Sequence, residues 1–218
     1  MLRALFEKTG NAVWISHLDL MRLFQRAFKR AGLPLTHTQG FNPRPSVSIA
    51  LPLSVGVESR CELLDFDLDG ENIPCDQIKA RLEKTLVDGI RVLDVYENGL
   101  KIKHLALLDC LVTLEYDGGV PCNAASAITE LFARESVAVE KKGKNGIQEQ
   151  DIIPMIRSFS VEAGEKELLL RARICCQNPT LNPMQLAAAV ERYLPERKPD
   201  FAKCTRLEIF DAGQKIFR

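Results

Sequence analysis

The stretch SHLDLMRLFQRAFKRA, residues 16–31, is the clearest helix in the sequence. At 100° per residue its apolar side chains, Phe24 among them, fall on one broad face, which is typical of a helix that packs one side on a core. Ser16 followed by Asp19 resembles a capping box and predicts where the helix begins. Gly32 and Pro34 follow the last periodic residue and predict where it ends.

Strand and helix patterns continue around this helix in a regular order. In the first half we expect strands at about 2–8, 12–15, 46–51, 61–68 and 90–96, and a second helix at 75–88. In the second half we expect strands at 107–116, 136–141, 153–161, 167–176 and 204–210, helices at 122–135 and 182–194, and a turn at 141–146. The first half therefore reads β-α-β-β-α-β, and the second half repeats the order of elements.

This order predicts an α+β protein made of two tandem ferredoxin-like domains with antiparallel sheets. The expected domains are residues 1–98 and 105–218, joined by a linker at about 97–105. Trp14 and Phe24 are both expected in the core of the first domain.

Composition narrows the class of protein. Hydrophobic residues make up 46% of 218 residues, which is enough for a packed core. No apolar run reaches the ~18 residues that span a bilayer, and the N-terminus does not resemble a signal peptide, so we expect a cytoplasmic protein. The seven cysteines form no C-x-x-C pair, which indicates reduced, mostly buried thiols and no metal or iron–sulfur site in this chain.

Charge is unevenly distributed along the chain. The formal net charge is zero, but residues 1–60 hold eight basic and three acidic residues, a net charge of +5 that the remaining 158 residues balance. Such a difference suggests an anionic partner for the basic N-terminal quarter. Four of these bases, Arg22, Arg26, Lys29 and Arg30, lie on the polar face of the 16–31 helix. That face is either simply solvated or follows a row of phosphates.

The loop HTQGFNPRPSVSIA, residues 37–50, follows the helix directly. Gly40 permits a sharp turn, while Pro43 and Pro45 stiffen the chain after it. The side chains offered there include an aromatic ring on which a nucleobase can stack, amides that can bind nucleobase edges, and a cationic group that can bind phosphate. They are His37, Gln39, Phe41, Asn42 and Arg44. This set suits single-stranded nucleic acid. The same segment could also be a structural plug packed against the sheet.

The histidines are the candidates for catalysis. His17 points toward the core side of the helix, which favours a structural role, whereas His37 lies in the loop and is less constrained. If the protein were a metal-independent endoribonuclease, these two would be the acid and the base.

A long motif now suggests a family. WISHLDLMRLFQRAFKRAGLPLTHTQGFNPRPSVSIALPLSVGVES, residues 14–59, resembles the signature of the bacterial radical-SAM-linked proteins of uncharacterised function (DUF2344-type). The matching pattern runs from SHLD through GFNP-x-P to PL-x-x-G-x-x-S, with Lys29 where arginine is expected. Weaker similarity continues in QDIIPMI (150–156) and TRLEIF (205–210).

The resemblance implies an accessory protein whose partner is a radical-SAM protein of the cobalamin-binding type. The radical chemistry would belong to that partner, so no cofactor and no independent catalytic activity are expected here. Tandem ferredoxin-like domains with a histidine near the first helix are also similar in architecture to CRISPR repeat-processing endoribonucleases, an analogy that fixes no function.

Three functions therefore compete. The favoured one is an RNA-binding accessory protein for RNA modification or processing, with phosphates held by Arg22, Arg26, Arg30 and Arg44 and a base contacted by Gln39, Phe41 and Asn42. The second is a protein-docking adaptor for the radical-SAM partner that uses segment 16–59 without nucleic acid. The third, less favoured, is the endoribonuclease.

Overall fold

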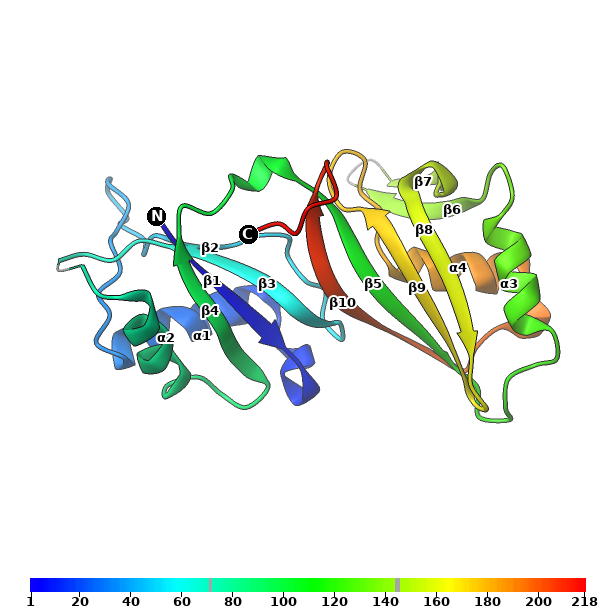
Figure 1. Cartoon of the computed structure of the whole chain (residues 1–218), viewed down its shortest axis with the longest axis horizontal. Coiled ribbons are helices and arrows are strands. Elements are labelled where there is room, and N and C mark those ends of the chain that lie inside the picture. Colours follow the sequence, from blue (N-terminus) through cyan, green and yellow to red (C-terminus); the bar gives the residue numbers. More distant parts are fainter. Residues whose placement is uncertain (71, 144–145) are drawn as a thin grey trace. The chain divides into compact units, whose positions relative to one another are not determined.

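The computed structural model describes residues 1–70, 72–143 and 146–218, and it shows an α+β protein (Figure 1). The chain divides into two compact units, Met1–Ile102 together with Arg218, and Lys103–Phe217. Each unit holds four strands paired antiparallel with one another and two of the four α-helices found in the described residues. None of those helices is both long enough and apolar enough to cross a membrane.

The first unit has four strands and two helices. Its strands are adjacent in the order β4-β1-β3-β2, and every neighbouring pair is antiparallel. In chain order the elements are β1 (Leu2–Lys8), α1 (His17–Arg30), β2 (Val47–Ile49), β3 (Glu58–Phe66), α2 (Cys75–Glu83) and β4 (Ile90–Glu97).

Helix α1 packs on this sheet through aromatic side chains. The Phe24 ring lies 4.8 Å from the Phe6 ring of β1, and the Phe28 ring lies 4.8 Å from the Phe66 ring of β3, measured between centroids. All four side chains are buried, so the core position expected for Phe24 is confirmed. Such rings contribute both buried apolar area and edge-to-face attraction.

The start of α1 follows the expected chemistry. The Ser16 hydroxyl oxygen accepts a hydrogen bond from the backbone N–H of Asp19 at 3.2 Å, which satisfies one of the free donors of the first turn. At the other end Gly32 adopts a φ of +65°, the left-handed conformation that ends many helices.

The segment before α1 corrects two expectations. Residues 12–15 are not a strand, because Gly10–Trp14 form a 3₁₀ turn that Gly10 enters with a φ of +54°. The turn directs Ala12 and Val13 into the protein and leaves Trp14 67% exposed rather than in the core. Buried Lys8 holds the turn by donating its Nζ hydrogen bond to the Val13 carbonyl at 3.0 Å.

In the second unit four strands are adjacent in the order β10-β5-β9-β8, each neighbouring pair antiparallel, and β6 and β7 form a separate two-stranded sheet. Its elements are β5 (Leu105–Glu115), α3 (Ala124–Phe132), β6 (Ala138–Gly143), β7 (Gly146–Asp151), β8 (Ile156–Ala163), β9 (Glu167–Cys175), α4 (Met184–Tyr193) and β10 (Phe201–Asp211). Strand β7 is absent from the sequence-based expectation. The turn expected at 141–146 includes residues 144 and 145, which lie outside the described residues.

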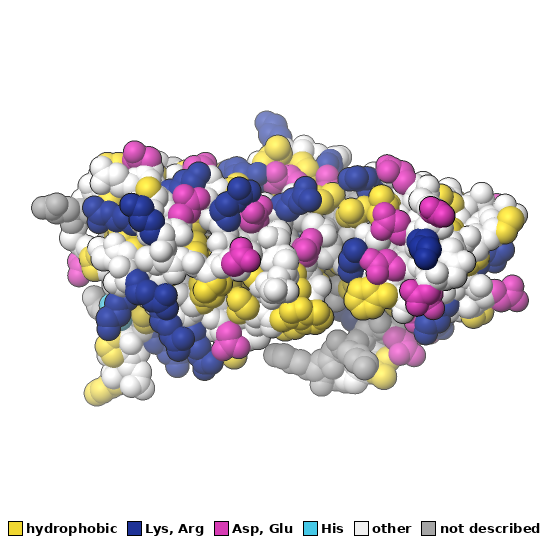
Figure 2. All heavy atoms as spheres, turned by 90° about the horizontal axis from the view of Figure 1, so that it is seen from below, with side chains coloured by type: hydrophobic (Ala, Val, Ile, Leu, Met, Phe, Trp, Pro, Cys, Tyr) yellow, Lys and Arg dark blue, Asp and Glu magenta, His cyan; other side chains and the backbone are white. Residues whose placement is uncertain are grey.

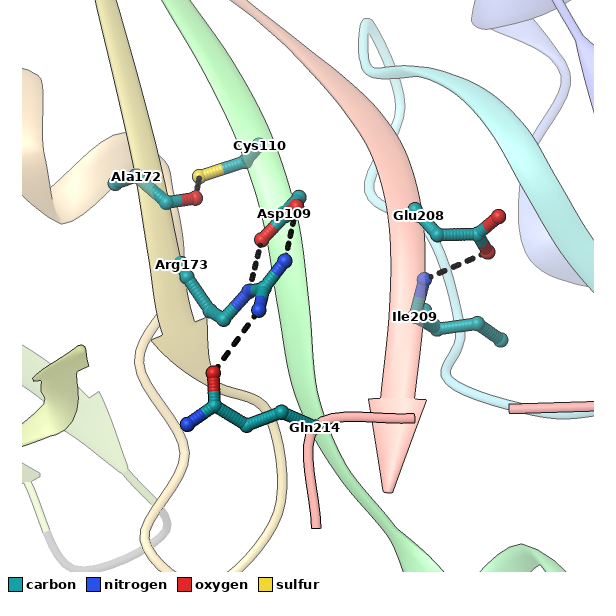
Figure 3. Close-up of polar contacts among 7 residues, drawn as sticks. All are labelled: Asp109, Cys110, Ala172, Arg173, Glu208, Ile209 and Gln214. Atoms are coloured by element: carbon teal, nitrogen blue, oxygen red, sulfur yellow. Dashed lines mark hydrogen bonds and ion pairs between the residues drawn. The ribbon is translucent and has the colours of Figure 1, made fainter. Parts of the chain in front are cut away.

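A polar cluster ties three parts of the second unit together (Figure 3). Arg173 of β9 donates two hydrogen bonds to the Asp109 carboxylate of β5, at 2.7 and 2.9 Å, and a third to Gln214 at 3.0 Å. Its guanidinium also lies 3.9 Å from the centroid of the Phe210 ring. This bidentate geometry fixes Arg173 in one orientation and leaves it little freedom to bind anything else.

The first unit has a more deeply buried ion pair. Arg3 of β1, only 1% exposed, donates to both carboxylate oxygens of Asp65 in β3, at 2.5 and 3.0 Å. Its remaining terminal nitrogen donates to the Leu100 carbonyl at 2.8 Å. The guanidinium thus joins two strands to the segment that follows β4.

We predict that Asp65→Ala lowers the free energy of unfolding by about 3 kcal/mol, because it leaves the Arg3 charge buried without its carboxylate. Urea unfolding followed by circular dichroism measures the change. The control is Arg91→Ala, which removes the exposed partner of the 2.9 Å pair with half-buried Glu7 and is expected to cost about 0–1 kcal/mol. Equal losses in the two variants would contradict the prediction.

Candidate nucleic-acid interface

The solvent face of α1 carries a group of positive charges. Arg22, Arg26, Lys29 and Arg30 are all exposed and are called here the cationic strip. At 100° per residue they fall within an arc of about 100°, and at 1.5 Å per residue they extend over about 12 Å of the helix. Figure 2 shows Lys and Arg side chains gathered in a band over the first unit.

One acid lies beside the strip. Arg22 donates to the Asp19 carboxylate at 3.0 Å, and the Ser16 hydroxyl donates to the same carboxylate at 2.7 Å. These hydrogen bonds, that of Ser16 first, together with the nearby charges of Arg22 and Arg26, lower the pKa of Asp19. Asp19 is therefore ionised at neutral pH, and its negative charge offsets part of the positive charge of the cationic strip. In the part of the chain that the structure describes, Arg26, Lys29 and Arg30 form no ion pair.

The segment after α1 is a hydrogen-bonded hairpin, called here the 36–46 hairpin. The Thr38 N–H donates to the Arg44 carbonyl at 2.8 Å, the Ser46 N–H donates to the Thr36 carbonyl at 2.7 Å, and the Arg44 N–H donates to the Thr38 hydroxyl at 3.0 Å. Asp67 lies directly after β3. Its backbone carbonyl accepts from the Thr36 N–H at 2.9 Å, and its backbone N–H donates to the Ser46 carbonyl at 3.3 Å. The base of the hairpin is thus part of the sheet structure.

The tip of the hairpin, light blue in Figure 1, is exposed to solvent. Gly40 adopts a φ of +131°, which residues with a side chain rarely do, and the next residue, Phe41, is 106% exposed. The polar residues expected to contact nucleic acid, His37, Gln39, Asn42 and Arg44, are exposed as well. Pro43 is exposed, and Pro45 is half-buried at the base, where it pairs with His37. The structural-plug interpretation therefore suits the base of the hairpin and not its tip.

The two candidate catalytic histidines are at opposite ends of the first unit. His17 is the first residue of α1 and lies close to the 3₁₀ turn. In that turn the Val13 carbonyl accepts a 2.9 Å hydrogen bond from the N–H of Gly56, a residue just before the start of β3. His37 lies in the hairpin that is anchored on Asp67, just after β3 ends. Fourteen residues of helix, about 20 Å, and the nine residues of β3 separate these two ends. The structure does not bring the pair together.

Three exposed apolar residues near the start of α1 or next to Gly56, called here the exposed cluster, were missed by the sequence reasoning. Trp14 and Leu18 are each 67% exposed, and Val55 is 53% exposed. The Trp14 ring lies over Gly56, at 3.5 Å from the position that a Cβ there would take. The available signal was Leu18, an apolar residue one turn before Arg22 and off the core face of the helix.

The thiols are not set up as nucleophiles. Five of the seven cysteines are buried, Cys75 is half-buried, and Cys122 is exposed. Burial raises the pKa of Cys176 to about 11 and that of Cys204 to about 12, so both stay protonated at neutral pH. Among the described residues, no three His, Cys, Asp or Glu side chains are placed to hold a metal ion.

We predict that a thiol reagent such as DTNB modifies Cys122 first in the native protein, since a thiol must be accessible and ionised to react. Cys122→Ser is expected to remove the fast phase. A native protein in which several thiols react at the Cys122 rate would contradict the burial.

The raised pKa values of the buried thiols also predict that the free energy of unfolding falls as pH rises above about 9, because the thiols then lose protons only in the unfolded chain.

We predict that Phe41→Ala changes the free energy of unfolding by less than about 0.5 kcal/mol, since the side chain is fully exposed. The matched control is Phe24→Ala, which removes a buried ring and is expected to cost about 3–5 kcal/mol. Denaturant unfolding of both variants measures the difference. A large loss in Phe41→Ala would show that the ring is a structural part of the hairpin.

Comparisons with solved structures give only weak likenesses. A chain in "Crystal Structure of a Cbf5-Nop10-Gar1 Complex" is 10% identical, with a TM-score of 0.49, over 94% of this chain and 48% of that one. The present chain thus spans about half the length of that match. A chain in "Crystal Structure of an Unknown Protein from Galdieria sulphuraria" is 14% identical, with a TM-score of 0.26, over 94% of this chain and 96% of that one. Neither likeness is strong enough to assign a function.

No curated protein is detectably similar in sequence. A family model does match, and it is described as "Uncharacterized protein conserved in bacteria (DUF2344)". The match covers residues 1–183, which include the whole first unit up to Ile102, the cationic strip and the 36–46 hairpin. Because this is far more than half of the 218 residues, the chain belongs to the DUF2344 family.

Proposed function

We propose that the protein is an RNA-binding accessory protein that works with a radical-SAM partner of the cobalamin-binding type in RNA modification or processing. The observation that carries the RNA part is the fully exposed Phe41 at the tip of a hydrogen-bonded hairpin, which follows directly on the helix with the cationic strip. The partner rests on the resemblance of residues 14–59 to radical-SAM-linked proteins.

A single exposed apolar side chain is common on protein surfaces, so Phe41 supports RNA binding through its setting: an ordered hairpin, two neighbouring amides and the cationic strip. Every nucleobase offers a flat face on which such a ring can stack. Gln39 and Asn42 flank the ring closely in sequence, and their amides can donate to and accept from base edges. The bonds within the 36–46 hairpin order these groups before binding, which reduces the entropy lost when RNA binds.

The cationic strip and Arg44 would supply sequence-independent affinity through phosphate contacts. Arginine suits this role because its planar guanidinium matches the geometry of a phosphate. Asp19 offsets part of the strip at Arg22, whereas Arg26, Lys29 and Arg30 carry no such neutralising ion pair in the described residues.

We also propose that both units are ferredoxin-like and form tandem domains, at 1–98 and 105–218. The first unit has the element order β-α-β-β-α-β and the strand order β4-β1-β3-β2. With the β6–β7 pair set aside as an insertion after α3, the second unit has the same element order and the corresponding strand order β10-β5-β9-β8. These orders support the split-βαβ classification in each unit.

An endoribonuclease is the least supported of the candidate functions. General acid–base cleavage requires both groups within hydrogen-bond reach of the same phosphate and hydroxyl. His17 and His37 are anchored near opposite ends of β3. The proposed protein therefore binds and presents RNA, and the reaction belongs to its partner.

Protein docking is the second candidate, and the exposed cluster of Trp14, Leu18 and Val55 favours it. Tryptophan is enriched among the residues that dominate protein–protein binding energy. Docking at this cluster and RNA binding at the hairpin would use opposite ends of α1 and are compatible with each other.

We expect the protein to bind bulk tRNA in a fluorescence-anisotropy assay, with affinity falling steeply as salt increases. A variant with Arg22, Arg26 and Arg44 all changed to alanine should bind weakly and flatten the slope of log K against log salt by about 2–3, given roughly 0.7–0.9 per phosphate contact. The matched control changes Arg81, Arg91 and Arg134, which are exposed elsewhere, to alanine. It should leave the slope unchanged.

Absence of binding at low salt would overturn the RNA role and favour docking. The next measurement would then be a pull-down of the radical-SAM partner in high salt and RNase, comparing wild type with Trp14→Ala plus Leu18→Ala. Loss of the partner in that variant would establish the exposed cluster as the docking site.

A further inference from the structure

The cationic strip and Phe41 together point to a narrower class of ligand than RNA in general. We infer that the preferred ligand is a base-paired RNA stem that carries a single unpaired nucleotide beside the paired segment, rather than an extended single strand. This inference rests on the proposed RNA-binding function and specifies its substrate.

The first observation is the regularity of the strip. Arg22, Arg26 and Arg30 follow one another at four-residue intervals, about 6 Å apart along the axis of α1. They lie on a helix whose opposite face is fixed in the core by Phe24 and Phe28. A rigid row of charges suits a rigid row of phosphates, and a duplex supplies phosphates at higher density and with more regular spacing than a flexible strand does.

The second observation is the number of stacking surfaces. Proteins that bind single strands stack successive bases on several aromatic side chains. In the first unit, where every Phe, Tyr and Trp is described, only Phe41 and Trp14 among them are exposed. His37, whose ring can also stack, is exposed at the base of the hairpin, where it pairs with Pro45. Trp14 lies over Gly56, before the start of α1, and so at the other end of the helix from the hairpin. The hairpin thus presents one phenyl ring, and no second exposed Phe, Tyr or Trp of the first unit lies next to it in the hairpin to continue a stack of bases.

The third observation is the chemistry around Phe41. Gln39 and Asn42 are exposed next to the ring, and amides recognise the edges of bases. A base inside a continuous stem hides its Watson–Crick edge in pairing and both of its faces in stacking. Only an unpaired nucleotide offers a face to Phe41 and an edge to these amides at once, while its flanking stem remains available to the strip.

The test is a binding series with four RNAs of equal length: a stem with one bulged nucleotide, the same stem fully paired, the stem with the nucleotide unpaired at its end, and an unstructured strand. We expect the two stems with an unpaired nucleotide to bind roughly 5- to 150-fold more tightly than the fully paired stem, the range that stacking one base gives. Phe41→Ala should abolish this preference, and Phe41→Trp should keep it. A 2-aminopurine at the unpaired position should change its fluorescence on binding to wild type and not to Phe41→Ala.

The outcomes distinguish the preference for an unpaired nucleotide from RNA binding itself. Equal binding to all four RNAs, or tightest binding to the unstructured strand, would overturn the inference and leave RNA binding intact. A preference that survives Phe41→Ala would also overturn it, because the ring would not be the group that reads the unpaired base. No binding to any of the four, in a protein that also fails to bind bulk tRNA, would remove the proposed function itself.

Discussion

The packing of α1 on the sheet is the interaction on which the candidate site depends. Two aromatic contacts, Phe6 with Phe24 and Phe28 with Phe66, lie one turn apart along the helix and hold both its middle and its C-terminal half. With these rings buried, the rotation of the helix about its axis is fixed. Its four positive charges must then face solvent, and the chain must leave the helix toward the end of β3 that anchors the hairpin.

The sequence predicted those parts that depend on local chemistry and periodicity. Ser16, the apolar stripe with Phe24, and Gly32 define α1 to within one residue at each end. The exposure of Phe41 also follows from local signals, because Gly40 and Pro43 confine it to a turn with few neighbours. Periodicity and turn chemistry require only a few consecutive residues, so a single sequence is enough to show them.

The remaining features depend on contacts that are distant in the chain. Trp14 looked like a core residue because it is large and apolar, yet the 3₁₀ turn held by Lys8 places Val13 inside and Trp14 outside. The pairing of the hairpin with Asp67 joins residues more than twenty positions apart, and no pattern in the loop announces it. The separation of His17 from His37 depends on which segments lie at the two ends of β3, and the local sequence around each histidine does not encode this.

The arrangement also bears on how easily another chain could pair with the β2 edge of the first unit. Within the first unit β2 is one of the two outer strands, and it is only three residues long, Val47–Ile49. Pro45 and Pro52 lie on either side of it, and neither has an N–H to offer to an approaching strand. A short outer strand bounded by prolines gives another chain little to pair with, so Pro45, which also stiffens the candidate RNA-binding loop, helps to protect this edge from edge-to-edge association.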